Sequence, residues 1–180
     1  MADLPKPDLP EPDLPEAWLR GTLTEVPPVQ RAVLHALELA EEDLKRWCGG
    51  LTDEEINARP SGLPPVAFQL RHIARSLDRL LTYAEGGSLS GEQLAKLKSE
   101  SAKGARRVDL FREFEAAIRD SVARIRAYGS DSLELVRSVG RRQLPTTVGG
   151  LLVHVADHTQ RHVGQAITTA KIVRARRTEL

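Results

Sequence analysis

Apolar residues recur at intervals of three and four along four long stretches of this chain, the spacing typical of amphipathic helices. The stretches cover residues 28–47, 65–84, 109–128 and 147–174. Asp109 is expected to cap the third helix, and a shorter helix is expected near residues 91–99. Only residues 133–139 have a β-like pattern. The arrangement of apolar positions therefore predicts an all-α protein.

The lengths of the connections indicate how the four long helices are arranged. Four amphipathic helices of this size are typical of a four-helix bundle. About 23 residues, 86–108, separate the second helix from the third, whereas antiparallel neighbours are usually joined by about 2–8 residues. A connection that long can cross the whole bundle. We therefore expect the second and third helices to run in parallel, joined by one long crossover.

Residues 1–17 differ in composition from the rest, with aspartate, leucine and proline repeating every five residues. Prolines at this density prevent a helix and favour polyproline II. Leu4, Leu9 and Leu14 occupy equivalent positions in the repeat. We expect an extended N-terminal arm in which at least two of these leucines pack against the bundle or a second subunit; a solvated tail is the alternative. Residues 18–180 are expected to form the bundle domain.

Composition argues against several classes of protein. The formal net charge is +1, so the basic excess of a nucleic-acid-binding protein is absent and no direct contact with nucleic acid is expected. No apolar run approaches the ~20 residues of a membrane helix, and the first residues lack the apolar segment of a signal peptide. Cys48 is the only cysteine, which excludes an intrachain disulfide and favours a packed thiol. A soluble cytoplasmic protein is expected.

The candidate chemistry lies in the histidines. Three of the five, His154, His158 and His162, lie four residues apart on the last predicted helix, so neighbouring ones share a face and can approach one metal ion. All three cannot do so, because about 12 Å of helix rise separates the outer two. At ~100° per residue, His158 and His162 fall within the apolar arc and His154 at its edge. The inward pair predicts either a metal site or core histidines hydrogen-bonded to neighbouring helices.

A metal site needs a third ligand from another helix, and His35 and His72 are the candidates. His35 lies opposite the apolar stripe of its helix and is expected to be exposed. His72 lies at the rim of an apolar face, so its spacing supports it only weakly. Three arginines follow the same side of that helix: Arg71, Arg75 and Arg79. They predict either a solvated face paired with Asp78 or a rim that binds an anionic group of a substrate.

Several segments of the sequence resemble the DinB-like superfamily, also described as DNA-damage-inducible proteins. They are residues 70–78, residues 144–149 and the run His158-Thr-Gln-Arg-His162-Val-Gly-Gln165. The last segment resembles the family's most specific motif, His-x-x-x-His-Arg-Gly-Gln, with Val163 in place of the arginine. The resemblance covers about residues 18–172. It implies an up-down-down-up four-helix bundle with a metal site made of His72, His158 and His162.

The resemblance also implies a function. Such proteins hold zinc, nickel or a similar divalent ion and include enzymes that use a low-molecular-weight thiol, often as homodimers. Three histidines leave open positions on the ion, where a bound water or thiol becomes more acidic. We therefore expect a metal-dependent transferase or hydrolase with a small-molecule substrate, and Arg75, Arg79 and Gln165 as substrate contacts. The alternatives are a non-catalytic metal-binding or stress-response interaction protein and a structural dimer without metal.

Overall fold

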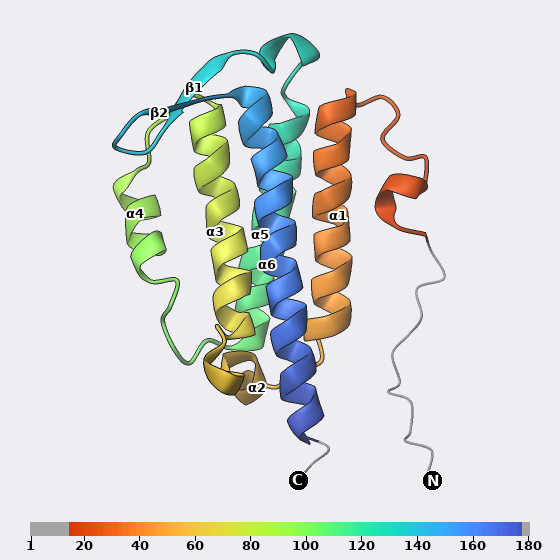
Figure 1. Ribbon diagram of the computed structural model, residues 1–180, viewed down its shortest axis with the longest axis vertical. Coiled ribbons are helices and arrows are strands. Elements are labelled where there is room, and N and C mark those ends of the chain that lie inside the picture. The colour runs from red at the N-terminus through yellow and green to blue at the C-terminus, as the bar shows by residue number, and fades with distance from the viewer. Residues whose placement is uncertain (1–14, 178–180) are drawn as a thin grey trace.

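Four long helices dominate the computed structural model, which describes residues 15–177 (Figure 1). They are α1 (Pro28–Cys48), α3 (Val66–Ala84), α5 (Arg107–Arg126) and α6 (Val148–Arg177). The shorter elements are α2 (Asp53–Asn57), α4 (Gly91–Lys98) and an antiparallel hairpin of β1 (Val136–Val139) and β2 (Leu144–Thr147). The predominantly helical class is confirmed, and each long helix begins and ends within three residues of its expected bounds. The hairpin corrects the strictly all-α prediction.

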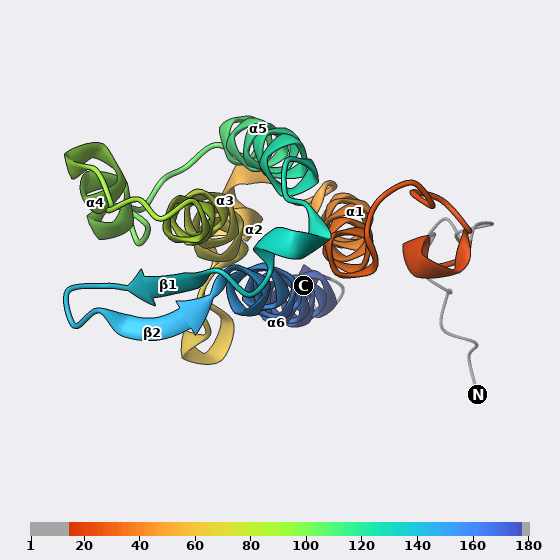
Figure 2. The same cartoon turned by 90° about the horizontal axis from the view of Figure 1, so that it is seen from above.

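The four long helices pack side by side and bury their apolar faces against one another, as Figure 2 shows from above. Each contributes fully buried side chains, among them Leu37, Leu44, Leu70, Leu77, Phe114 and Leu152. These positions belong to the apolar stripes of the sequence, so the predicted phase of each helix is correct. Burying a side chain of this size contributes about 1.5–3 kcal/mol, which makes this core the main source of stability.

Contacts between side chains fix the direction in which α3 and α5 run. Arg75 of α3 bonds to Glu113 of α5. Further along both helices, Glu85 at the C-terminal end of α3 bonds to Arg124 near the end of α5. The two helices therefore run in the same direction, as the length of their connection predicts. That connection contains α4 and passes back along the outside of α3, whereas α6 runs antiparallel to α3 (Figure 1).

The β-like pattern at residues 133–139 contains β1, but the sequence did not predict β2, the pairing of the hairpin or α2. The hairpin turn needs positive φ angles at Gly140 (71°) and Gln143 (49°), and each strand has only four residues, too few for alternation to be distinctive. The helix α2 begins with a capping box between Thr52 and Glu55, a Thr-x-x-Glu signal that is visible in the sequence. Asp109 lies in the first turn of α5 and does not cap it, because its carboxylate bonds to neighbouring arginines.

The segment before α1 folds back along that helix. Arg20 anchors it through ion pairs with Glu38 and Glu42. The covering segment leaves His35 only 7% exposed, with Nε2 3.1 Å from the Thr22 hydroxyl. The prediction that His35 is exposed is therefore wrong. The helical wheel describes α1 alone and takes no account of the segment that covers it.

The remaining expectations concern the N-terminal arm, the membrane and the cysteine. The contacts expected of Leu4, Leu9 and Leu14 lie outside the described residues. Within residues 15–177, no helix combines the length and the apolar character that crossing a bilayer requires. Cys48 is fully buried, as expected, and burial raises the pKa of its thiol to about 12.

Candidate metal centre

The rings of three histidines meet between α3 and α6. His72 projects from α3, and His158 and His162 project from α6 one helical turn apart. The ring centroids are 4.4–5.0 Å apart, and one nitrogen of each ring lies within 4.8 Å of those of the other two. Among residues 15–177, these three form the group of metal-ligating side chains whose geometry suits an ion. They are the residues that the resemblance to the DinB-like proteins names.

Two of the rings are held by strong acceptors on the side that faces away from the cluster. His72 Nδ1 lies 2.7 Å from Glu100 Oε2, and His162 Nδ1 lies 2.7 Å from Gln69 Oε1. Carboxylate and amide oxygens only accept hydrogen bonds, so this network assigns the proton of each ring to Nδ1. The Nε2 atoms of both rings are then left with free lone pairs.

His158 has a neutral and more distant partner. Its Nδ1 lies 3.4 Å from the Ser76 hydroxyl oxygen, and that hydroxyl already donates to the backbone carbonyl of Ile73. While the serine donates to Ile73 it can only accept from the ring, and in this arrangement the proton of His158 lies on Nδ1 as well. The Nε2 atoms of His72 and His158 then face each other without a proton, and His162 keeps the lone pair of its Nε2 free.

The Nε2 atoms of His72 and His158 are 3.3 Å apart. Two lone pairs at this distance repel each other unless a positive charge lies between them. Two nitrogens bound to tetrahedral zinc at about 2.0–2.1 Å are themselves about 3.3 Å apart, so this spacing and the donor set fit a divalent cation. The competing arrangement is a hydrogen bond from His158 Nε2 to His72. In that arrangement the Ser76 hydroxyl would have to turn away from the Ile73 carbonyl to donate to His158 Nδ1.

His158 and His162 of α6 are uncharged at neutral pH. The pKa of His158 falls to about 4, chiefly because of burial and also because His162 and His72 lie beside it. Burial likewise lowers the pKa of His162 to about 4, with His72 and Arg161 adding to the effect. Both rings are therefore neutral at pH 7, the state in which an imidazole binds a metal ion.

Glu100 comes from the connection between α4 and α5 and is only 4% exposed. Its Oε1 accepts from Arg79 at 2.6 Å and its Oε2 accepts from His72. Burial acts to raise the pKa of this carboxyl, but the hydrogen bonds from His72 and Arg79 outweigh it and hold the pKa below its usual range. Glu100 is therefore a buried anion directly behind one of the candidate ligands.

The predicted substrate contacts on α3 are engaged within the protein. Arg79 bonds to Glu100, and Arg75 bonds to Glu113 of α5. Asp78, which the sequence suggested as the partner of these arginines, bonds instead to Arg124. The expected solvated face is therefore replaced by a set of interhelical ion pairs.

Gln165, the third predicted substrate contact, lies next to the cluster. Its side-chain oxygen accepts from Gln69 at 3.0 Å, so it belongs to the network behind His162. His154 is exposed, with Nδ1 3.7 Å from a carboxylate oxygen of Asp157, and stays outside the cluster as the wheel indicates.

The sequence did not identify the residues that hold the histidines, namely Glu100, Gln69 and Ser76. Glu100 follows His72 by 28 positions, and Gln69 precedes His162 by 93. No local spacing links residues so far apart. Only the packing of α6 and the crossover against α3 brings them together.

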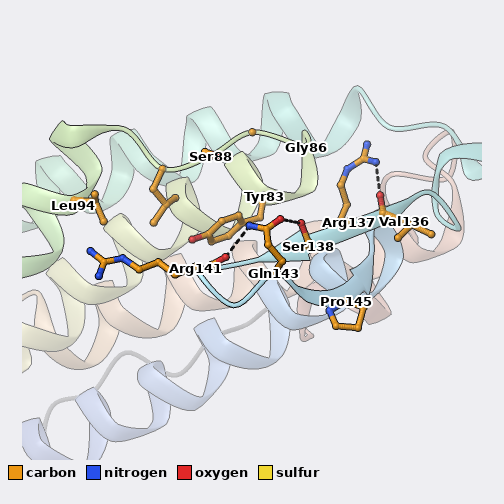
Figure 3. Close-up of a pocket in the computed structure, with 13 residues that line it drawn as sticks. Tyr83, Gly86, Ser88, Leu94, Val136, Arg137, Ser138, Arg141, Gln143 and Pro145 are labelled. Carbon is orange, nitrogen blue, oxygen red and sulfur yellow. Dashed lines mark hydrogen bonds between the residues drawn. The ribbon is translucent and has the colours of Figure 1, made fainter.

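A separate hollow of about 700 Å³ lies beneath the hairpin (Figure 3). It is bounded by the C-terminal end of α3, by α4 and by the hairpin turn. Arg137 and Arg141 line it, and none of its lining residues is Asp or Glu. No motif in the sequence indicates this hollow, because it forms between segments that are distant along the chain.

A mostly helical domain that gathers three histidines between two of its helices defines a class of candidate metal-binding proteins. The sequence matches the family model of the DinB superfamily over residues 36–166. The chain therefore belongs to the DinB superfamily, whose members generally bind metal.

Comparison with solved structures finds a protein of similar fold. The chain is similar to a conserved protein from Enterococcus faecalis, with 22% sequence identity and a TM-score of 0.68. The likeness covers 82% of this chain and 98% of that one. At this identity it shows the fold alone. The comparison with curated proteins gives no match, so any statement about the reaction has to come from the site.

Proposed function

We propose that the chain binds one divalent metal ion through the Nε2 atoms of His72, His158 and His162. The observation that carries the proposal is the convergence of the rings: one nitrogen of each lies within 4.8 Å of those of the other two, while each Nδ1 lies beside an oxygen. Membership of the DinB superfamily supports it. Zinc or nickel suits a set of imidazole ligands.

Such an ion would supply Lewis acidity to a water or thiol at the positions that three histidines leave open. The protein's part is to prepare the ligands. Glu100, Gln69 and Ser76 orient the rings, and burial keeps His158 and His162 neutral at pH 7.

For the reaction, we propose the transfer of a low-molecular-weight thiol to an electrophile or the hydrolysis of a small molecule. The open ligand positions and the family support an enzyme of this kind. Gln165 is retained as a substrate contact because it is exposed beside the site. Arg75 and Arg79 would first have to release their carboxylate partners, and this engagement favours a non-catalytic metal-binding protein as the second candidate.

We also propose that the four long helices form the up-down-down-up four-helix bundle and that the protein is a homodimer. The shared direction of α3 and α5 supports the first. The resemblance to the family supports the second, and sedimentation or light scattering would measure it.

Elemental analysis after exposure to zinc or nickel and dialysis tests the metal site. We expect about one ion per chain in the wild type, loss of the ion in His158→Ala and retention in His154→Ala. His154 is the matched control because it lies on the same helix, one turn away, and is exposed. A wild-type protein that retains neither metal would overturn the proposal and leave the three rings as hydrogen-bonded core histidines.

A panel of thiols and electrophiles, assayed with metal-loaded protein, separates the enzyme from the non-catalytic alternative. Turnover that is lost in His158→Ala and kept in His154→Ala supports the enzyme. Metal binding without turnover of any pair in the panel supports the second candidate.

A further inference from the structure

Two arginines of α3, Arg71 and Arg79, bind the connection that follows α4 through hydrogen bonds. Arg71 donates to the backbone carbonyls of Glu100 (3.1 Å) and Ala102 (2.9 Å). Arg79 donates to the Glu100 carboxylate at 2.6 Å. Both arginines are buried, so these bonds are largely shielded from water. Glu100 is thereby held at its backbone and at its side chain.

Arg75, one turn along the helix from each of these arginines, fastens the preceding residues. It donates to the backbone carbonyl of Lys96 (2.7 Å) and to the Ser99 hydroxyl (2.9 Å). Its Nε also donates to Glu113 of α5 at 2.7 Å. The crossover is therefore fixed to α3 from residue 96 to residue 102.

We propose that Glu100 is a positioning residue that fixes His72 as a metal ligand, an inference that rests on the proposed metal site. Its Oε2 accepts the Nδ1 proton of His72, which sets the tautomer and leaves Nε2 directed toward His158. Phe68 stacks on the same ring, with centroids 5.3 Å apart and an interplanar angle of 14°, and restricts its tilt. Arg79 in turn donates to the Glu100 carboxylate and so helps to keep it in contact with His72.

The partners of the three candidate ligands differ in charge. His72 faces a carboxylate, whereas His162 faces a neutral amide oxygen and His158 a hydroxyl at 3.4 Å. A carboxylate behind a ligating imidazole fixes the ring and raises the basicity of the nitrogen that binds the metal. Glu100 therefore contributes more to metal affinity than the partners of the other two rings.

Zinc affinity, measured by competition with a chromophoric chelator, tests this with Glu100→Gln. Loss of such a partner typically weakens metal binding about 10–100-fold, and we expect a loss in this range. The matched control is Glu113→Gln, which removes a carboxylate from the same set of arginine contacts without touching His72. The control should bind zinc within about threefold of the wild type.

A second measurement uses the unmodified protein. In metal-free protein, ¹⁵N NMR of the histidine side chains should show the His72 proton on Nδ1 in the wild type and a mixed or reversed tautomer in Glu100→Gln. If the wild type binds zinc and Glu100→Gln binds equally well, the positioning role is wrong and the metal site stands. If the wild type binds neither zinc nor, in the same titration, nickel, the proposed function fails. A His72 proton on Nε2 in the metal-free wild type overturns the positioning role even if the variant does not fold.

A second inference rests on the hollow beneath the hairpin and is independent of the metal. Arg137 is engaged there, since it donates to the carbonyls of Ala84 and Val136. Arg141 extends from the hairpin turn beneath Leu94, and within the described part of the chain its guanidinium has no ion-pair partner. Figure 3 shows the ring of Tyr83 between the two arginines.

We infer that this hollow binds a small organic anion with a planar apolar part, such as an aromatic carboxylate. Arg141 supplies an unpaired donor fork suited to a carboxylate, and Tyr83 supplies an aromatic surface. No Asp or Glu in the lining repels an anion. A volume of about 700 Å³ lies within the range of small-molecule sites.

Benzoate and its neutral analogue benzamide, titrated into ¹⁵N-labelled protein, test this inference. Benzoate should shift the amide resonances of the residues around the hollow, and Arg141→Gln should weaken its binding about tenfold through loss of a charge-assisted hydrogen bond. Arg142→Gln should change it by less than about twofold, because Arg142 follows in the same turn but does not line the hollow. No binding of benzoate, equal losses in the two variants, or equal binding of benzamide would each overturn the inference.

Discussion

The arginines of α3 are bonded to other parts of the protein, whereas those of the hairpin turn have no ion-pair partner in the described residues. Arg71 and Arg79 bond to acceptors in the connection after α4, and Arg75 bonds to Lys96 in the last turn of α4 and to Ser99 just after it. Arg141 and Arg142 have no ion-pair partner among residues 15–177. The α3 arginines were the ones whose spacing suggested a substrate contact. Spacing shows which side of a helix a charge occupies, but the tertiary fold decides whether the charge remains available.

Burial explains the difference. Arg71 and Arg79 are less than a tenth exposed, whereas Arg141 and Arg142 in the hairpin turn are exposed. A guanidinium removed from water loses its hydration and is stable only when the protein supplies acceptors. An exposed guanidinium keeps its water and needs no partner. Variants that remove single arginines should therefore separate the two groups by their effect on stability.

The largest effect is expected for Arg79→Gln. This change leaves the Glu100 carboxylate buried with only His72 as a side-chain partner. Breaking a buried ion pair by removing one member costs about 3–5 kcal/mol, and we expect a loss of unfolding free energy in this range. Urea unfolding at pH 7 measures it. A loss below about 1 kcal/mol would mean that Arg79 contributes as little to the free energy of unfolding as the exposed hairpin arginines, and it would contradict the expected effect of burial.

The double variant Arg79→Gln/Glu100→Gln is the control for this prediction. It removes both charges, so no buried ion is left unpaired. It should be more stable than Arg79→Gln alone. If the two losses simply add, the pair is not coupled and the large effect has another origin.

The same contrast shows which parts of the site the sequence could predict. The inward position of His158 and His162 follows from the local period of α6, and periodicity is preserved when the helix packs. His72 was found by resemblance, because it lies at the rim of its apolar face. Glu100 and Gln69 could not be found, because their bonds to the histidines join segments 28 and 93 residues apart.

The fold shows the same limit. The long helices were predictable because each carries its own apolar stripe. Of the hairpin, only the β-like character of residues 133–139 was predictable, since two strands this short are defined by pairing with each other. The exposure of His35 was predicted wrongly for a related reason. The segment before α1 that buries this side chain has no periodic pattern from which its position could be predicted.

Lowering the pH should reduce the free energy of unfolding through His158 and His162, which lie between α3 and α6. The hairpin arginines keep their charge and should not contribute to this loss. In the metal-free protein, His158 and His162 have pKa values of about 4, against 6.5 for a free histidine, so the unfolded state binds more protons between these values. Stability is therefore lost as the pH falls from about 6.5 to 4. Both rings are half-buried, so solvent screening reduces the effect and we expect a loss on the order of 2 kcal/mol.

Urea unfolding of metal-free protein at several pH values measures this loss. His162→Gln removes one of the two titrating groups and should show a shallower decline over the same range. The pKa of Glu100 lies below its usual value, so its contribution is present above about pH 4 and is lost only at lower pH. A wild-type protein with constant stability from pH 6.5 to 4 would contradict the burial of the α6 histidines.

A smaller effect is expected for Arg75→Gln, which tests whether the α3 arginines act as one group. Arg75 is less enclosed than Arg79, and its partner Glu113 is about a third exposed, so we expect a loss of only about 1 kcal/mol. No residue of α4 is buried, so this helix depends on polar contacts. Hydrogen exchange of the α4 amides should become faster while that of α5 stays the same. Unchanged exchange in α4 would show that Arg75 does not fasten the crossover.

The smallest effect is expected for Arg141→Gln, and its matched control lies in the same hairpin. Arg141 has no ion-pair partner in the described residues, so its loss should change the unfolding free energy by less than about 0.5 kcal/mol. Arg137 instead donates to the carbonyl of Ala84 at the C-terminal end of α3, where a cation also interacts favourably with the helix dipole. Arg137→Gln should therefore cost about 1 kcal/mol in the same urea experiment. If the two variants are equally destabilised, the guanidinium of Arg141 is bonded within the protein, and it is not available for an anion in the hollow.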